Sequence, residues 1–153
     1  ILAAAVIVGL AAGLVRSRIG KRSFQIISLR LPGLVIFAFL PQWVAFYQSR
    51  WGLRVPDEWA PALLVGSQVI LLVFVWINRK ASGFWLLGAG LALNLLVIAS
   101  NGGLMPISPE NVAKVYPDVP EDWWQVGKRL GNGKDIVLLP SMTRFWFLSD
   151  RFV

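Results

Sequence analysis

Three amide side chains inside apolar stretches are the strongest candidates for polar chemistry in this sequence: Gln42, Gln68 and Asn94. If the stretches are helices that cross one layer, a rise of about 1.5 Å per residue puts the amides within roughly 6 Å of one another in depth. An amide facing lipid is costly, whereas amides facing one another can exchange hydrogen bonds. Such a cluster would either hold helices together or line a polar pocket for a lipid headgroup or a quinone. Asn101, on the same helix face as Asn94, would extend that pocket to the outer surface.

Catalytic chemistry has few candidate residues. The sequence contains no His and no Cys, so imidazole and thiolate are excluded as catalytic groups and as haem or metal ligands. No Asp or Glu lies in an apolar stretch, which argues against proton-coupled transport and ion pumping. Carboxylates of the C-terminal third, such as Glu121 and Asp122, are explained as solvated loop residues. We therefore expect no catalytic residue, no metal site and no enzyme, with contacts to lipid, carotenoid or quinone in place of a tightly held cofactor.

The elements that must position the amides are predicted to be membrane helices. The chain is 56% hydrophobic and 15% charged, whereas soluble domains carry about 25% charged residues. A bilayer core needs about 20 apolar residues to cross, and continuous apolar runs lack the alternation of a barrel strand. The sequence predicts an all-α membrane protein with a four-helix transmembrane bundle over residues 1–100, its first helix truncated. The expected spans are residues 1–15, 31–47, 59–77 and 83–100.

Charge gives the expected orientation of these spans. The loops at 16–30 and 78–82 carry Lys and Arg without any acidic residue, while all 8 acidic residues lie in the remaining loop and in the tail at 101–153. Cytoplasmic loops retain positive charge. We therefore expect a multi-pass protein of the bacterial cytoplasmic (inner) membrane, with loops 16–30 and 78–82 in the cytoplasm and the tail outside. The net charge of +7 is then a topology signal, and we expect no nucleic acid partner.

The tail is predicted to hold short helices at the membrane surface. Asn101 and the two glycines after it should end the fourth helix. Ser108, followed by Pro and Glu, is typical of a helix start. A second amphipathic helix is predicted over residues 120–130, with Trp123 and Trp124 at headgroup level.

Small residues at helical spacing indicate close helix packing. Gly9 and Gly13 form a Gly-x-x-x-Gly motif in the first span, and Gly88 and Ala92 repeat the spacing in the fourth. Small side chains let helix backbones approach closely in lipid. We expect packing within the bundle rather than a dimer interface.

The segments at 93–98 and 101–109 resemble the signature of an uncharacterised family of small bacterial integral membrane proteins, known only as a domain of unknown function. Its members carry Leu-Asn-x-x-Val-Ile followed by Asn-Gly-Gly-x-Met-Pro-Val-Ser at the end of a span; here Ile107 replaces the usual Val. Residues 147–150 are similar to a later Leu-Gly-Asp element, with Ser149 in place of Gly. The resemblance implies a five-span protein whose last span would follow residue 153, and it implies no activity.

Two functional expectations follow from these observations. The first is a non-catalytic accessory or structural subunit of a larger bacterial membrane complex, of photosynthetic or respiratory type, whose partners are membrane lipids and other integral membrane subunits. Without His, such a subunit offers no imidazole to haem or bacteriochlorophyll. The alternative is a lipid-handling or small-solute membrane protein that uses the amide cluster.

Overall fold

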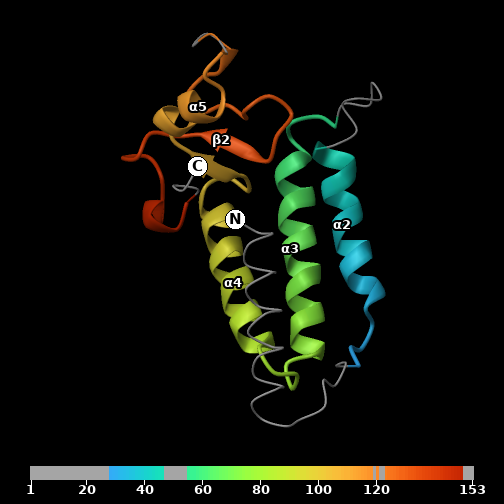
Figure 1. Cartoon of the computed structure of the whole chain (residues 1–153). Helices are drawn as coiled ribbons and strands as arrows, with labels where there is room; N and C mark the ends of the chain where they lie inside the picture. Colours follow the sequence, from blue (N-terminus) through green and yellow to red (C-terminus); the bar gives the residue numbers. More distant parts are fainter. Residues whose placement is uncertain (1–27, 47–54, 119, 121–122, 150–153) are drawn as a thin grey trace.

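The structure, a computed structural model, describes residues 28–46, 55–118, 120 and 123–149. Its long elements are α2 (Gly33–Phe46), α3 (Ala60–Ile77) and α4 (Phe84–Ser100), which stand side by side (Figure 1). Contacts join α3 to both α2 and α4. These helices lie within three of the four apolar blocks of the sequence. The span predicted at 1–15, with Gly9 and Gly13, lies outside the described residues.

Within the described part of the chain, α3 is the one helix that is both long and apolar enough to cross a bilayer. It has 18 residues, whereas α2 has 14 and α4 has 17. Four transmembrane helices are therefore not supported. The shortening has local causes: α2 begins only after Leu31, which has a φ of 52°, and Pro32, and α4 begins after Gly83, which has a φ of 85°.

The end of α4 confirms the predicted stop. Asn101 is its C-cap residue, and Gly102 and Gly103 follow in the left-handed region with φ values of 81° and 82°. The backbone N–H of Gly103 donates to the carbonyl of Ile98 over 2.8 Å, which satisfies a helix-end carbonyl. A Cβ at Gly103 would lie only 2.5 Å from the Cβ of Pro61 at the start of α3, so glycine also permits this close approach.

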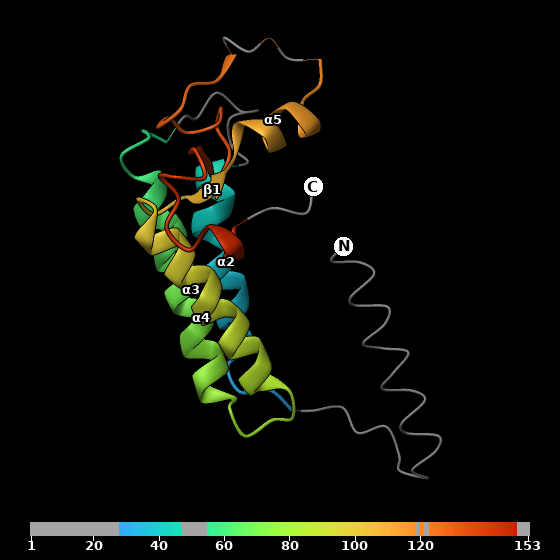
Figure 2. The same cartoon turned by 90° about the vertical axis from the view of Figure 1, so that its left-hand side faces the viewer.

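Residues 104–149, here called the head, form a small unit at one end of the helices (Figure 2). Its elements are β1 (Met105–Ile107), α5 (Pro109–Val115), β2 (Asp135–Val137) and the 3-10 helix η3 (Trp146–Leu148). The predicted start of α5 is confirmed, because Ser108 Oγ accepts a hydrogen bond from the backbone N–H of Asn111 at 3.3 Å. The all-α prediction is wrong for the head: β1 and β2 pair in parallel, with Met105 opposite Asp135.

The helix predicted over residues 120–130 is also wrong. Gly127 has a φ of 82°, which an α-helix does not accommodate, and its N–H donates to the carbonyl of Val137 over 2.7 Å. Arg129 forms an antiparallel bridge with Ile136. Gly131, with a φ of 53°, lies in the turn that returns the chain to β2. The Gly-Asn-Gly sequence at 131–133 is a hairpin signal, and it outweighs the helical spacing of the apolar residues before it.

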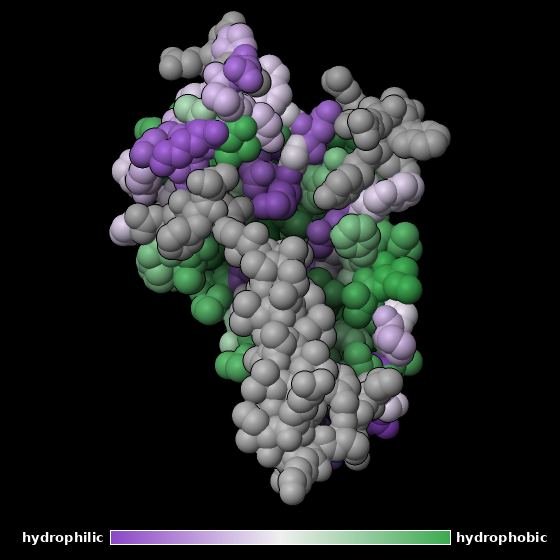
Figure 3. Space-filling view, viewed as in Figure 1, coloured by the Kyte–Doolittle hydropathy of each residue, from purple (hydrophilic) through white to green (hydrophobic). Residues whose placement is uncertain are grey.

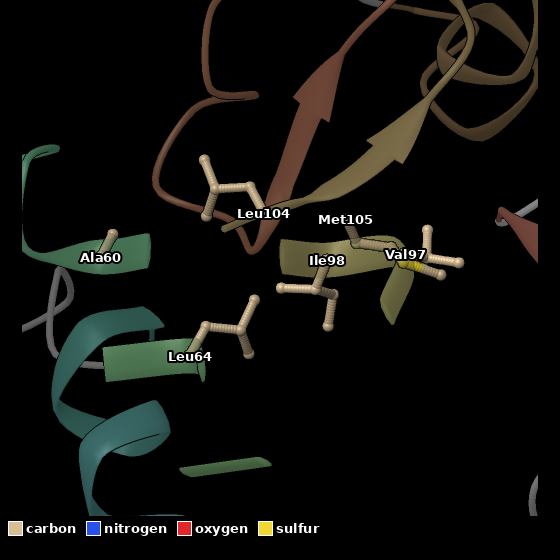
Figure 4. Close-up of a cluster of buried hydrophobic side chains, with 6 residues drawn as sticks. All are labelled: Ala60, Leu64, Val97, Ile98, Leu104 and Met105. Atoms are coloured by element: carbon tan, nitrogen blue, oxygen red, sulfur yellow. The ribbon is translucent and has the colours of Figure 1, made fainter. Parts of the chain in front are cut away.

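Two groups of buried side chains hold the head together and attach it to the helices. The first lies where α3 and α4 meet β1 (Figure 4) and comprises Ala60, Leu64, Val97, Ile98, Leu104 and Met105. The second lies inside the head, with Trp124 packed against it, and comprises Ile107, Val112, Leu130 and Val137. On the face seen in Figure 3, the visible flank of the helices is mainly hydrophobic, whereas most of the hydrophilic side chains lie on the head with hydrophobic ones among them.

Candidate functional site

The structure places Gln42, Gln68 and Asn94 at similar heights along the helices but does not join them to one another, and Gln42 has a partner of another kind. Gln42 Nε2 donates to Ser67 Oγ over 2.6 Å, and that hydroxyl donates in turn to the carbonyl of Leu64 over 2.8 Å. Ser67 is fully buried. The first amide therefore joins α2 to α3 through a serine, which matches the helix-holding interpretation at this position.

Gln68 and Asn94 lie at similar heights on the antiparallel pair α3 and α4. The register follows from Gly88, where a Cβ would lie 3.0 Å from Val75 Cγ1, and from the packing of Leu64 in one cluster with Ile98. Gln68 is buried, and its Oε1 has no hydrogen-bond partner among the residues that the structure describes, while Asn94 is half-buried. Within the described residues, no hydrogen bond links the three amides to one another.

Asn101 has a structural position at the end of α4. Its Nδ2 donates to the carbonyls of Val97 and Arg144 over 2.8 and 2.9 Å, and its Oδ1 accepts from the backbone N–H of Arg144 at 2.9 Å. Both ends of the amide are thus hydrogen-bonded to backbone groups of α4 and of the head. Asn101 therefore attaches α4 to the head and does not extend a pocket outward.

Asn78, which was not predicted from the sequence, makes the same kind of hydrogen bonds at the opposite end of the helices, where it joins α3 to Arg30. It is the C-cap residue of α3, and its Nδ2 donates to the carbonyls of Phe74 and Arg30 over 2.9 and 3.0 Å. Its Oδ1 accepts from the N–H of Arg30 at 2.8 Å. An asparagine directly after an apolar stretch is the signal the two sites share.

In both places the residue after the paired arginine has a positive φ. Leu31 has a φ of 52° and Phe145 a φ of 53°, a conformation that costs a bulky residue roughly 1–2 kcal/mol. In each place, two hydrogen bonds join the asparagine side chain to the backbone of the arginine just before the strained residue. These bonds hold the strained residue in its conformation. Each strained residue lies just before a helical element, α2 or η3, so the asparagines set where these elements begin.

Arg129, also missed, is the most heavily bonded charged side chain described. It is only 5% exposed and lies 3.0 Å from Asp57 Oδ1. Its Nε donates to the carbonyl of Gly133 over 2.6 Å, and its Nη2 donates to those of Asn132 and Ala45 over 2.7 and 3.2 Å. Because Ala45 lies at the carboxyl end of α2, the cation also favours the negative end of that helix. Arg129 therefore joins the head to α2 and to the segment before α3.

Beside this arginine, the surface is hollowed over a volume of about 780 Å³. Asp57 and Asp135 contribute carboxylates to the hollow, and Tyr116 and Trp123 contribute an aromatic pair with ring centroids 5.7 Å apart. Both carboxylates already pair with cations of the chain, Asp57 with Arg129 and Asp135 with Lys134 over 3.1 Å. Of the two tryptophans predicted at the membrane surface, Trp123 lines this hollow and Trp124 packs inside the head.

The small residues of α4 have separate roles. Gly88 is in close contact with Val75 of α3, which is packing within the bundle. Ala92 is exposed and lines an apolar groove between α3 and α4. In the part of the chain that the structure describes, no three Asp or Glu side chains gather as a metal-binding set.

Comparison with known proteins identifies a family and nothing narrower. A model described as a family of unknown function (DUF5317) matches residues 26–153. Comparison with curated proteins and with solved structures finds no match.

Proposed function

The chain belongs to this family of unknown function, and we propose that it is a multi-span bacterial membrane protein that serves as a non-catalytic accessory subunit of a larger complex. In this proposal the helices lie in the cytoplasmic membrane, loops 16–30 and 78–82 face the cytoplasm, and the head lies outside. The head would contact partner subunits, and the helices would contact lipid, quinone or carotenoid tails and partner helices.

The observation that carries the proposal is the apolar surface of the three long helices. Ile36 on α2 is 70% exposed and Leu86 on α4 is 81% exposed. Further large apolar side chains are exposed along the same helices, including Phe37, Phe39, Val69, Val73, Trp85 and Leu93. Extensive exposed apolar surface of this kind is typical of contact with lipid or another protein. The head mixes hydrophilic side chains with exposed aromatic ones such as Trp123 and Phe147, a combination that supports a position at the membrane surface.

Photo-crosslinking in the native membrane tests the accessory role. A photoreactive residue at Ile36 or Leu86 is expected to give an adduct with another membrane subunit, because these two side chains are the most exposed apolar ones described on α2 and α4. A photoreactive residue at Met142, which is 56% exposed on the head, tests in the same way the contact with partner subunits proposed for the head. Purification of the chain alone from mild detergent at full stability, with only lipid adducts from both helix positions, would contradict the proposal.

Labelling of a single introduced cysteine tests which side of the membrane the head lies on, because the sequence contains no other cysteine. Lys114→Cys on the head should react with a membrane-impermeant maleimide in intact cells. Lys80→Cys, an equally conservative change in the loop at 78–82, should react only after lysis. The reverse pattern would place the head in the cytoplasm.

A second candidate function, binding of a small solute or lipid headgroup at the amides, is favoured by one observation. In the described part of the chain, Gln68 Oε1 is buried without a hydrogen-bond partner, and leaving such an atom unpaired costs about 1–3 kcal/mol. A binding site can retain a residue that costs stability, because a ligand would supply the missing donor.

Gln68→Leu separates this candidate from a purely structural role. We expect the variant to unfold at an equal or higher temperature in detergent, because the unpaired oxygen is removed. Gln42→Leu is the control, and it should lose about 1 kcal/mol with the hydrogen bond to Ser67. Unchanged cellular function of Gln68→Leu would remove the second candidate; lost function in a folded variant would support it.

A further inference from the structure

A groove of about 340 Å³ runs between α3 and α4 on the side of the molecule that carries the loop at 78–82. The space falls within the usual range of small-molecule sites, about 300–1,000 Å³. Its walls are almost wholly apolar: Leu72, Val75 and Phe84 lie beside the small residues Gly88, Ala89 and Ala92. The small residues leave room for a slender apolar group along α4.

The mouth of this groove is both aromatic and cationic. Trp76 and Trp85 meet there in an edge-to-face arrangement with ring centroids 6.5 Å apart. The guanidinium of Arg79 lies 4.4 Å from the centre of the Trp76 ring. Exposed tryptophans of this kind are typical of the headgroup level of a membrane.

Arg79 has donors to spare at this position. Its Nη1 donates to the carbonyl of Trp76 over 3.0 Å, and within the described residues this is the one hydrogen bond of its guanidinium. An arginine carries five N–H donors, so most of them can reach an anion outside the groove. Lys80, the next residue, is exposed and adds a second cation at the same end.

We propose that this groove binds an anionic phospholipid, with an acyl chain along Gly88 and Ala92 and the phosphate on Arg79 and Lys80. The proposal rests on the membrane location proposed above, which places this loop at the cytoplasmic leaflet, where anionic lipids are attracted to basic residues beside membrane helices. Charge complementarity favours a phospholipid over a partner helix, because a helix packed on this apolar groove would not require two cations at its mouth.

Lipid retention from nanodiscs tests the site. The full chain is reconstituted in phosphatidylcholine with a minor share of phosphatidylglycerol and released into mild detergent, and the bound lipid is counted by native mass spectrometry. Phosphatidylglycerol should be retained in preference to phosphatidylcholine. Arg79→Gln should lower that retention about fivefold, because Arg79 lines the mouth of the groove where the phosphate would lie. Lys80→Gln should lower it less, because Lys80 lies beside the mouth and not in the lining of the groove.

Arg30→Gln is the control for Arg79→Gln, and Ala99→Leu is the control for Ala92→Leu. Arg30→Gln removes the same charge from the same end of the molecule, where the backbone of Arg30 pairs with Asn78 and its side chain lies outside the groove, so retention should not change. Ala92→Leu fills the groove and should lower retention of both lipids. Ala99→Leu enlarges another exposed alanine of α4 outside the groove and should have no effect.

The outcomes separate this site from the proposed function. Equal losses in Arg79→Gln and Arg30→Gln, or no preference for phosphatidylglycerol, would overturn the lipid site even when the chain resists extraction from membranes by carbonate. A chain that carbonate extracts would overturn both proposals. Crosslinks from Ala92 to a second copy or another subunit, in place of lipid, would also overturn the lipid site.

Discussion

Replacing Arg129 by methionine is expected to lower the free energy of unfolding by about 3 kcal/mol or more and to loosen the head from α2. Methionine retains much of the apolar stem but no donor. The carbonyls of Ala45, Asn132 and Gly133 would all lose the N–H groups that now satisfy them. Thermal unfolding in detergent and limited proteolysis of the head would measure the loss.

Two matched variants show which part of Arg129 matters. Arg129→Lys keeps the charge, but a single ammonium cannot reach carbonyls on several sides at once, so an intermediate loss is expected. Asp57→Asn removes the charge of the ion-pair partner, whose side chain is 76% exposed, and should cost less than about 1 kcal/mol. A loss in Asp57→Asn as large as that in Arg129→Met would show that the ion pair, and not the hydrogen bonds to carbonyls, holds the head.

The three long helices, the end of α4 and the start of α5 could be predicted from local sequence. The apolar blocks contain α2, α3 and α4, and the Asn-Gly-Gly segment ends α4 where glycine is required. The Ser-Pro-Glu start of α5 is equally local, because the capping hydroxyl lies three residues from the N–H that it satisfies. These features depend on neighbours along the chain, which the sequence displays directly.

The head could not be predicted in the same way. Strands β1 and β2 have three residues each, too few for a periodic signal, and they pair residues that are far apart in sequence. The helical spacing of Trp123 and Leu130 was misleading because the Gly-Asn-Gly turn after them brings the chain back onto β2. Arg129 has no distinguishing local signal in the sequence, because two of its partners, Asp57 and Ala45, lie far away along the chain.

The candidate site was predicted in part for a related reason. Spacing along a helix gives the depth of an amide, and the level shared by Gln42 and Ser67 agrees with that argument. The rotation of a helix about its axis decides which neighbour the amide contacts. The sequence does not show this rotation, because the faces of these three apolar helices differ little in polarity. The serine that Gln42 contacts could therefore not be identified from the sequence.

Gly103→Ala is expected to cost about 3 kcal/mol, from two separable causes. A non-glycine residue at a φ of 82° costs roughly 1–2 kcal/mol, and overpacking against a rigid neighbour costs about 1–3 kcal/mol more. The added Cβ would lie 2.5 Å from the Cβ of Pro61 and 3.1 Å from its Cα. The proline ring and the start of α3 cannot yield without moving Ala60 and Leu64 out of the cluster that attaches the head.

Gly102→Ala isolates the backbone cause, because Gly102 has a nearly identical φ of 81° but no atom within 4 Å of the position that an added Cβ would take. It should cost only the roughly 1–2 kcal/mol of the left-handed conformation. Pro61→Gly combined with Gly103→Ala should recover part of the difference, since the nearest clashing atom is gone, and a double-mutant cycle of unfolding temperatures would show this coupling. Equal losses at the two glycines, with no coupling to Pro61, would mean that α3 and α4 do not meet as closely at this end as the 2.5 Å contact requires.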